Sequence, residues 1–307
     1  MLTFKVLSAL ALAMAAKALP NAAAPAHGKP ALPSKSPNYW FSFGDSYTQT
    51  GFDPTGVLPS VGNPLGNPPY PGWTSTGGEN WVDYVATKYN KSVLLTYNYA
   101  YGGAVINETL VTPWQPGLKH LTDQVAQFLE GAGPKKGGEK WTGVNSLFSV
   151  FIGINDIGNS WYLEGDRDAF AEVLLDNYFQ LVQKLYDIGG RSFLFVLVPP
   201  IDRSPMMAAY GPESQAGEKK VLAGFNSRLI NRVELFGKSN SGVKTYIYDS
   251  VAQYNEILDN PTKYGFKDAL SYGPDPDEFW GNDYHPSSYA HKFFGERVAQ
   301  VLSQTIF

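Results

Sequence analysis

The stretch NYWFSFGDSYTQTG, residues 38–51, runs from an apolar, aromatic segment directly into Gly44-Asp45-Ser46. Glycine, aspartate and serine are ordinary turn residues, so a simple surface turn is one interpretation. The other is a serine presented at the carboxyl end of a buried strand, which is the edge where open parallel sheets place their active sites. The remaining strands of the chain decide between the two.

Four further apolar runs resemble the one that opens this stretch. All five are continuous rather than alternating, as expected for strands whose two faces are both covered. They span residues 39–43, 94–99, 147–152, 193–198 and 244–248. Helix-length stretches with apolar residues every three or four positions alternate with them, at residues 81–89, 121–129, 170–188, 219–236 and 287–303. This alternation predicts one α/β domain over residues 37–307, with a parallel sheet between two helical layers.

The N-terminus is typical of an export signal. Lys5 precedes a short apolar run, and Ala16-Lys17-Ala18 provides a small-x-small cleavage site. The run is too short to span a bilayer. We therefore expect a signal peptide over residues 1–18, a disordered leader rich in proline and alanine over residues 19–36, and a secreted, extracellular protein without a transmembrane segment.

Composition excludes several classes of site. The chain has no cysteine, which rules out disulfides and thiolate metal ligands. Its net charge of −4 becomes about −6 without the signal peptide, and no block of Lys or Arg occurs, so no nucleic-acid partner is expected. We expect a monomer that needs no metal or cofactor. Asn90 and Asn107 begin N-x-Ser/Thr sequons and are possible N-glycosylation sites.

Chemically useful residues follow several of the expected strands. Ser46 follows the first, NYAYGGA (residues 98–104) the second, and FIGINDIG (residues 151–158) the third. FWGNDYHPS, residues 279–287, precedes the last helix. Because the carboxyl ends of parallel strands share one edge of the sheet, we expect these segments to converge.

Histidines identify the candidate base. His27 lies in the leader, and we interpret His120 and His291 as capping or surface residues. His285 lies in an aromatic, aspartate-bearing turn just before Pro286 and is the remaining candidate. A serine hydroxyl becomes a nucleophile only when such a base removes its proton, and the base itself needs an orienting acid.

An acyl-transfer intermediate also needs hydrogen-bond donors for its oxyanion. The backbone N–H of Ser46, a glycine N–H at Gly102 or Gly103, and the side-chain amide of Asn155 could supply them. A helix cap is the alternative interpretation of Asn155-Asp156.

Together, these four blocks and their order resemble the SGNH, or GDSL, hydrolase superfamily across essentially the whole mature domain. FGDSYTQTGF, GGENWVDYVA and HPSSYAH further resemble fungal family 16 carbohydrate esterases, which are acetylesterases. The resemblance implies a flavodoxin-like α/β/α sandwich and esterase or lipase chemistry without a metal. It also implies Ser46 as nucleophile, His285 as base, and Gly103 and Asn155 as oxyanion donors, although Gly102 stays open as an alternative to Gly103.

The sequence departs from the family pattern at the acid. The family places it three residues before the histidine, where this chain has Asn282, whereas Asp283 is two residues before. An amide can hold the ring but cannot stabilise an imidazolium as a carboxylate does. We therefore predict that the turn brings Asp283 to His285, with Asn282 as the alternative. Asp45 is interpreted as structural, accepting backbone N–H bonds in its turn.

Extended loops with aromatic residues are expected at residues 52–80, 204–217 and 249–281. The aromatic candidates for stacking on sugar rings, with core packing as the alternative, are Tyr70, Trp73, Trp114, Trp161 and Trp280. These features favour an acetylesterase that acts on acetylated oligosaccharides from hemicellulose, or on another small ester. The alternatives are a GDSL lipase or phospholipase for longer acyl chains and a non-catalytic carbohydrate-binding relative.

Overall fold

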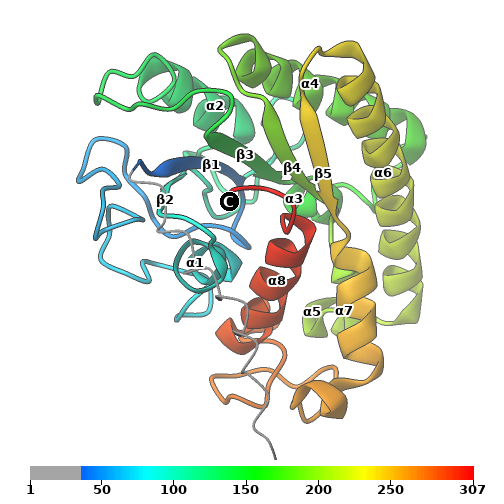
Figure 1. Ribbon diagram of the computed structural model, residues 1–307. Helices are drawn as coiled ribbons and strands as arrows, with labels where there is room; N and C mark the ends of the chain where they lie inside the picture. Colours follow the sequence, from blue (N-terminus) through cyan, green and yellow to red (C-terminus); the bar gives the residue numbers. More distant parts are fainter. Residues whose placement is uncertain (1–35) are drawn as a thin grey trace, which may run out of the picture. The chain divides into compact units, whose positions relative to one another are not determined.

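The computed structural model describes residues 36–307, which form a five-stranded parallel sheet between two layers of helices (Figure 1). The strand order is β2-β1-β3-β4-β5. The strands are β1 (Asn38–Gly44), β2 (Leu94–Asn98), β3 (Ser146–Phe151), β4 (Ser192–Val196) and β5 (Lys244–Tyr248). The predicted α/β/α architecture is confirmed. Helices cover both faces of the sheet, and this is the arrangement in which strands are continuous apolar runs.

The helices divide between the two faces of the sheet. On one face, α2 (Leu121–Glu130), α4 (Arg167–Asp187) and α6 (Pro212–Ser239) pack side by side. On the other, α1 (Trp81–Tyr84), which continues as a π-helical turn, packs against α8 (Ser288–Val301). No helix within residues 36–307 is both long and apolar enough to cross a membrane.

Two of the three expected loops prove to contain helices. Residues 204–217 hold α5 (Pro205–Tyr210) and the first turns of α6, and residues 249–281 begin with α7 (Ser250–Asp259). The start of α5 is set by local sequence. The Ser204 side chain accepts a hydrogen bond from the Met207 N–H, and Pro205 occupies the first helical position. Residues 52–80, in contrast, contain no helix.

The interior strand β1, between β2 and β3, carries the Gly-Asp-Ser turn at its carboxyl end. Every residue of β1 is buried, and Gly44 is in register with Phe151 of β3. A Cβ atom at Gly44 would lie 2.5 Å from the Phe151 carbonyl oxygen, so only glycine allows the two strands to approach this closely. The serine is thus attached to an interior strand of the sheet.

The last residues of the chain lie at the opposite edge of the sheet. Asn38, at the start of β1, donates hydrogen bonds to the Ser92 hydroxyl at 2.7 Å and to the Ile306 carbonyl at 3.5 Å. The Ser92 hydroxyl donates in turn to the same carbonyl at 3.0 Å. The expected signal peptide and leader lie outside the described residues, apart from Ser36.

Candidate active site

Ser46 lies in a tight turn that Asp45 organises. The Asp45 carbonyl accepts hydrogen bonds from the N–H groups of Thr48 and Gln49, and its carboxyl group accepts one from the Tyr47 N–H at 3.0 Å. Asp45 is completely buried, and this burial raises the pKa of its carboxyl group to about 8. The side chain therefore supports the turn and does not face the substrate.

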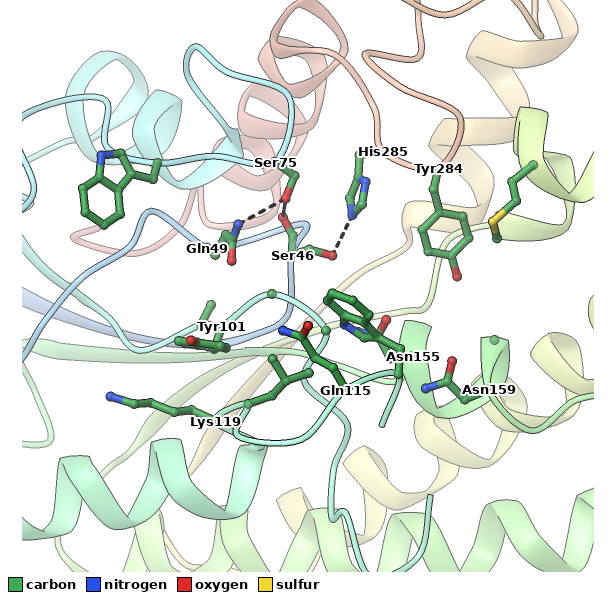
Figure 2. Close-up of a pocket in the computed structure, with 18 of the residues that line it drawn as sticks. Ser46, Gln49, Ser75, Tyr101, Gln115, Lys119, Asn155, Asn159, Tyr284 and His285 are labelled. Atoms are coloured by element: carbon green, nitrogen blue, oxygen red, sulfur yellow. Dashed lines mark hydrogen bonds between the residues drawn. The ribbon is translucent and has the colours of Figure 1, made fainter. Parts of the chain in front are cut away.

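The hydroxyl of Ser46 meets the ring of His285, which comes from the turn before α8 (Figure 2). The distance from Ser46 Oγ to His285 Nε2 is 2.8 Å. Burial lowers the pKa of His285 to about 4, so the ring is neutral at neutral pH. Its Nδ1 faces an amide oxygen and must carry the proton, which leaves Nε2 free to accept the serine hydroxyl proton.

The structure places Asn282, and not Asp283, at the far side of the ring, which corrects the sequence-based assignment. Asn282 Oδ1 lies 3.0 Å from His285 Nδ1 and also accepts the backbone N–H groups of Tyr284 at 2.9 Å and His285 at 2.7 Å. Asp283 is exposed, and its carbonyl accepts the Met206 N–H at 2.8 Å. Two backbone N–H groups and the ring N–H of His285 converge on one acceptor position. The side-chain oxygen of Asn282, three residues before the histidine, occupies this position.

The expected oxyanion donors line the same pocket as Ser46 and His285. Asn155 stands on α3 (Ile154–Gly158), and one of its two amide N–H groups donates to the Ala104 carbonyl at 2.9 Å. That bond fixes the amide and leaves its second N–H for a ligand. Gly102 and Gly103 both line the pocket, so the choice between them stays open.

The acid next to Asn155 has a structural role. Asp156 is completely buried and accepts the Ile106 N–H at 2.9 Å, and burial raises the pKa of its carboxyl group to about 7. It ties the segment that carries the two glycines to α3.

The pocket has a volume of about 1160 Å³ and a largely aromatic rim. Trp73, Trp114, Tyr162 and Tyr210 all line it, and their exposed fractions lie between 62% and 72%. Several large aromatic side chains this exposed around one pocket indicate a binding surface.

The five aromatic residues singled out from the sequence have different roles. Trp73, Trp114 and Trp161 line the pocket, whereas Tyr70 lies in a separate groove and hydrogen-bonds Glu79. Trp280 is completely buried, with its indole N–H donating to the Ala269 carbonyl at 3.0 Å. Core packing, the alternative interpretation, thus holds for Trp280.

The other two described histidines are buried acceptors for backbone N–H groups. His120 precedes α2, and its Nδ1 accepts the Val105 N–H at 3.2 Å. His291 Nδ1 accepts the N–H of Trp81, the first residue of α1, at 3.3 Å. The capping interpretation fits both residues, because His120 is the N-cap residue of α2 and donates its N–H to the Asp123 carboxylate at 2.8 Å, whereas His291 accepts the first N–H of α1. A surface position is wrong for both residues.

Several pocket residues carry no signal in the sequence. The Ser75 hydroxyl donates to the Ser46 carbonyl at 2.7 Å, and Ser75 comes from the C-terminal part of the long loop at residues 52–80. Tyr284 lines the pocket beside His285, with the two rings edge to face and their centroids 5.5 Å apart (Figure 2). Glu218 of α6 is buried, with both carboxyl oxygens unpaired among the described residues. Tyr284 lies within the block FWGNDYHPS but had no role assigned to it, and Ser75 and Glu218 lie outside the four blocks.

The two sequon asparagines are partly buried. Asn90 Nδ2 donates to the Ser92 carbonyl and Asn107 Nδ2 to the Asn177 side chain, so N-glycosylation of either stays a prediction. Across residues 36–307, no group of three or more His, Asp or Glu side chains is arranged to hold a metal ion.

Comparison with known proteins identifies the family. Residues 41–298 match the family described as GDSL-like Lipase/Acylhydrolase. The chain belongs to this family. It is 42% identical to an acetylesterase from Thermothelomyces thermophilus, over 89% of this chain and 90% of the relative. An acetylesterase from Hypocrea jecorina is 23% identical, over 86% of this chain and 88% of that protein.

The fold of this GDSL-family chain also matches solved structures. A mutant of an acetyl-xylooligosaccharide esterase from Geobacillus superposes with a TM-score of 0.51 at 14% identity, covering 88% of this chain and 95% of that one. With the family and its curated relative established, the chain is a carboxylic ester hydrolase.

Proposed function

We propose that this GDSL-family esterase removes acetyl groups from soluble hemicellulose oligosaccharides through an acyl-enzyme on Ser46. The observation that carries the proposal is the nucleophile–base pair, at 2.8 Å, at the floor of a pocket rimmed by exposed aromatic side chains. The relative from Thermothelomyces thermophilus, an acetylesterase, supports the acetyl group as the acyl portion.

The reaction follows from the hydrogen bonds of the pair. Ser46 Oγ attacks the ester carbonyl while His285 Nε2 takes its proton, and the Asn282 amide oxygen holds the ring in the tautomer that permits this. The Ser46 N–H, the Asn155 amide and a glycine N–H would stabilise the oxyanion. His285 then gives its proton to the leaving alcohol and activates a water molecule that releases the acid.

The rim favours a saccharide as the alcohol portion. Flat aromatic faces pack against sugar rings, and Trp73, Trp114, Tyr162 and Tyr210 place such faces around the opening. Tyr284 lines the same pocket, and its hydroxyl would donate a hydrogen bond to a sugar hydroxyl beside the ester.

A lipase for longer acyl chains is the second candidate, because the pocket is large enough to hold such a chain. A volume of about 1160 Å³ exceeds what an acetyl group needs, so either a sugar or a long acyl chain must fill the remainder. An inactive carbohydrate-binding relative is disfavoured. Binding alone does not require a chain of hydrogen bonds from Ser46 through His285 to Asn282.

The deciding experiment measures hydrolysis of p-nitrophenyl esters from acetate to palmitate, followed by mass spectrometry of acetylated xylo-oligosaccharides. Ser46→Ala serves as the blank. We expect activity on acetate to exceed that on octanoate by at least tenfold, and the oligosaccharides to lose 42 Da per event, the mass difference between an acetyl group and hydrogen. A maximum at long chains would replace this proposal with the lipase.

Export is part of the same proposal, because hemicellulose oligosaccharides are found outside the cell. It rests on the sequence of residues 1–18, with Lys5, the apolar run and Ala16-Lys17-Ala18. N-terminal sequencing of protein from the culture medium of an expressing fungus would test it. A start at residue 19 is expected, whereas protein retained in the cells with an intact N-terminus would contradict export.

A further inference from the structure

We propose that Ser75 is a positioning residue that fixes both the nucleophile and the residue that orients the base. It comes from the loop at residues 52–80, far in sequence from the two groups that it joins. Its hydroxyl donates to the Ser46 carbonyl at 2.7 Å, and its own carbonyl faces the Asn282 amide, with an Nδ2-to-oxygen distance of 3.5 Å. Figure 2 shows Ser75 directly beside Ser46, on the side facing Gln49.

The bond to Ser46 controls the direction of the nucleophile. Ser46 lies in a turn, and its carbonyl belongs to the peptide unit that follows the reactive side chain. Gln49 Nε2 lies 3.4 Å from the Ser75 hydroxyl and donates to it, which directs the hydroxyl proton toward the Ser46 carbonyl. Without this bond, the turn can rotate and carry Oγ away from His285 Nε2.

The bond to Asn282 selects which end of the amide faces the histidine. An amide is nearly symmetric in shape, with an acceptor oxygen at one end and a donor NH₂ at the other. Three N–H groups surround Oδ1, so the opposite end needs an acceptor, and the Ser75 carbonyl supplies it. A flipped amide would set its NH₂ group against three donors and leave the Ser75 carbonyl facing an oxygen.

Neighbouring contacts hold this part of the loop against the histidine-bearing turn. The Thr76 hydroxyl donates to the Pro286 carbonyl at 3.0 Å. A Cβ atom at Gly281 would lie 2.5 Å from the Thr76 Cβ, so the Gly281 backbone contacts the Thr76 side chain directly. Ser75 is therefore held from its C-terminal side through Thr76, which keeps it in place between Ser46 and Asn282.

The test compares Ser75→Ala with two matched variants. Ser75→Thr keeps the hydroxyl. Thr74→Val removes a neighbouring loop hydrogen bond, from the Thr74 hydroxyl to the Gly78 carbonyl at 2.8 Å, that does not touch the site. Since misplacing reacting atoms by about 1 Å costs about 100-fold in rate, we expect Ser75→Ala to lower kcat for p-nitrophenyl acetate by about 10- to 100-fold with little change in KM. The inactivation rate of Ser46 by an organophosphonate should fall by the same factor.

We expect Ser75→Thr to retain most of the activity and Thr74→Val to match the wild type. The double variant Ser75→Ala/Asn282→Ala should lose less than the product of the single losses, because both act on the same hydrogen-bonded pair. The proposal is overturned if Ser75→Ala stays within twofold of Thr74→Val in kcat, or if Ser75→Thr fails to restore activity in a protein of wild-type melting temperature. Because p-nitrophenyl acetate is the substrate, these outcomes do not depend on whether the natural substrate is a saccharide.

Discussion

Replacing Asn282 with aspartate should raise the pKa of His285 and move the acid limb of the pH–rate profile upward. In the wild type the ring has a neutral amide oxygen 3.0 Å from Nδ1, and burial lowers its pKa to about 4. The base is active when unprotonated, so kcat/KM should fall only as the pH drops through about 4. A carboxylate at the same position would favour the protonated ring.

The size of the shift can be worked out from the geometry. Two unit charges about 4 Å apart interact by about 4 kcal/mol at an effective dielectric constant of about 20. At about 1.4 kcal/mol per unit, this is an upper limit of about three pKa units. Because the ring borders an open pocket, solvent screens part of the interaction, and we expect the acid limb to move to between about pH 5 and pH 7.

The effect on kcat at pH 8 should be much smaller than in other serine triads. There, replacing aspartate by asparagine costs about 10⁴-fold because the ring adopts the wrong tautomer. Here the N–H groups of Tyr284 and His285 already hold the Asn282 oxygen toward Nδ1, so the tautomer is correct. Aspartate adds only its charge, and a gain of about tenfold or less is expected.

The assay is the pH dependence of kcat/KM for p-nitrophenyl acetate from pH 3.5 to 8.5, read after alkaline quenching, with Ser46→Ala subtracted. Asp283→Asn is the matched control and should leave the acid limb in place. Asn282→Ala should lose far more activity than Asp283→Ala. An unmoved acid limb in Asn282→Asp, or a limb that shifts in Asp283→Asn, would refute the reasoning.

Three further outcomes follow from buried or pocket-lining groups. Burial raises the pKa of Glu218 from 4.5 to about 8. Between these two pH values the folded state keeps a proton that the unfolded chain releases. The free energy of unfolding therefore falls with rising pH, by up to about 1.4 kcal/mol per pH unit across that range. Glu218→Gln should therefore raise the melting temperature at pH 8 and leave it unchanged near pH 4; an equal shift at both would contradict the titration. Tyr284→Phe should lower kcat/KM about 3- to 10-fold for acetylated xylo-oligosaccharides, the worth of one hydrogen bond, and less for p-nitrophenyl acetate; equal losses would show that no sugar contact is made. Gly44→Ala, with its Cβ 2.5 Å from the Phe151 carbonyl, should destabilise the fold by about 1–3 kcal/mol in urea titration and slow labelling of Ser46; unchanged values would mean that the strands can separate there.

Strands β1 to β4 were predictable because burial on both faces produces a continuous apolar run in the sequence. The edge strand β5 is only partly buried, and its aromatic and β-branched residues indicated it. The helices α5 and α7 were missed because their segments carry Ser, Pro, Asp and Tyr, which suit loops as well as helix starts. From the sequence, Ser204 and Asp249 were expected to begin loops. In the structure they are N-caps, and their side chains accept hydrogen bonds from the Met207 and Ala252 N–H groups. Composition alone does not separate these two uses of the same residue types.

The site shows the same division. Ser46, His285 and Asn155 stand at strand ends or helix starts, where the order of blocks along the chain sets their meeting place. Asn282 and Asp283 are adjacent, and only the path of the turn decides which faces the ring. Chemistry favoured the carboxylate, whereas backbone geometry selects the residue three before the histidine, because its side chain alone reaches the N–H groups of residues 284 and 285.

The contact of Ile306 with Asn38 has a practical consequence for engineering. Both ends of the described domain emerge at the amino-terminal edge of the parallel sheet, whereas Ser46 opens at the carboxyl-terminal edge. A surface tether or a carbohydrate-binding module fused after Phe307 would therefore leave the pocket facing away from the attachment point. The same proximity would let a short peptide join the two ends directly, so that new termini could be opened elsewhere and the enzyme cyclised or permuted without disturbing its chemistry.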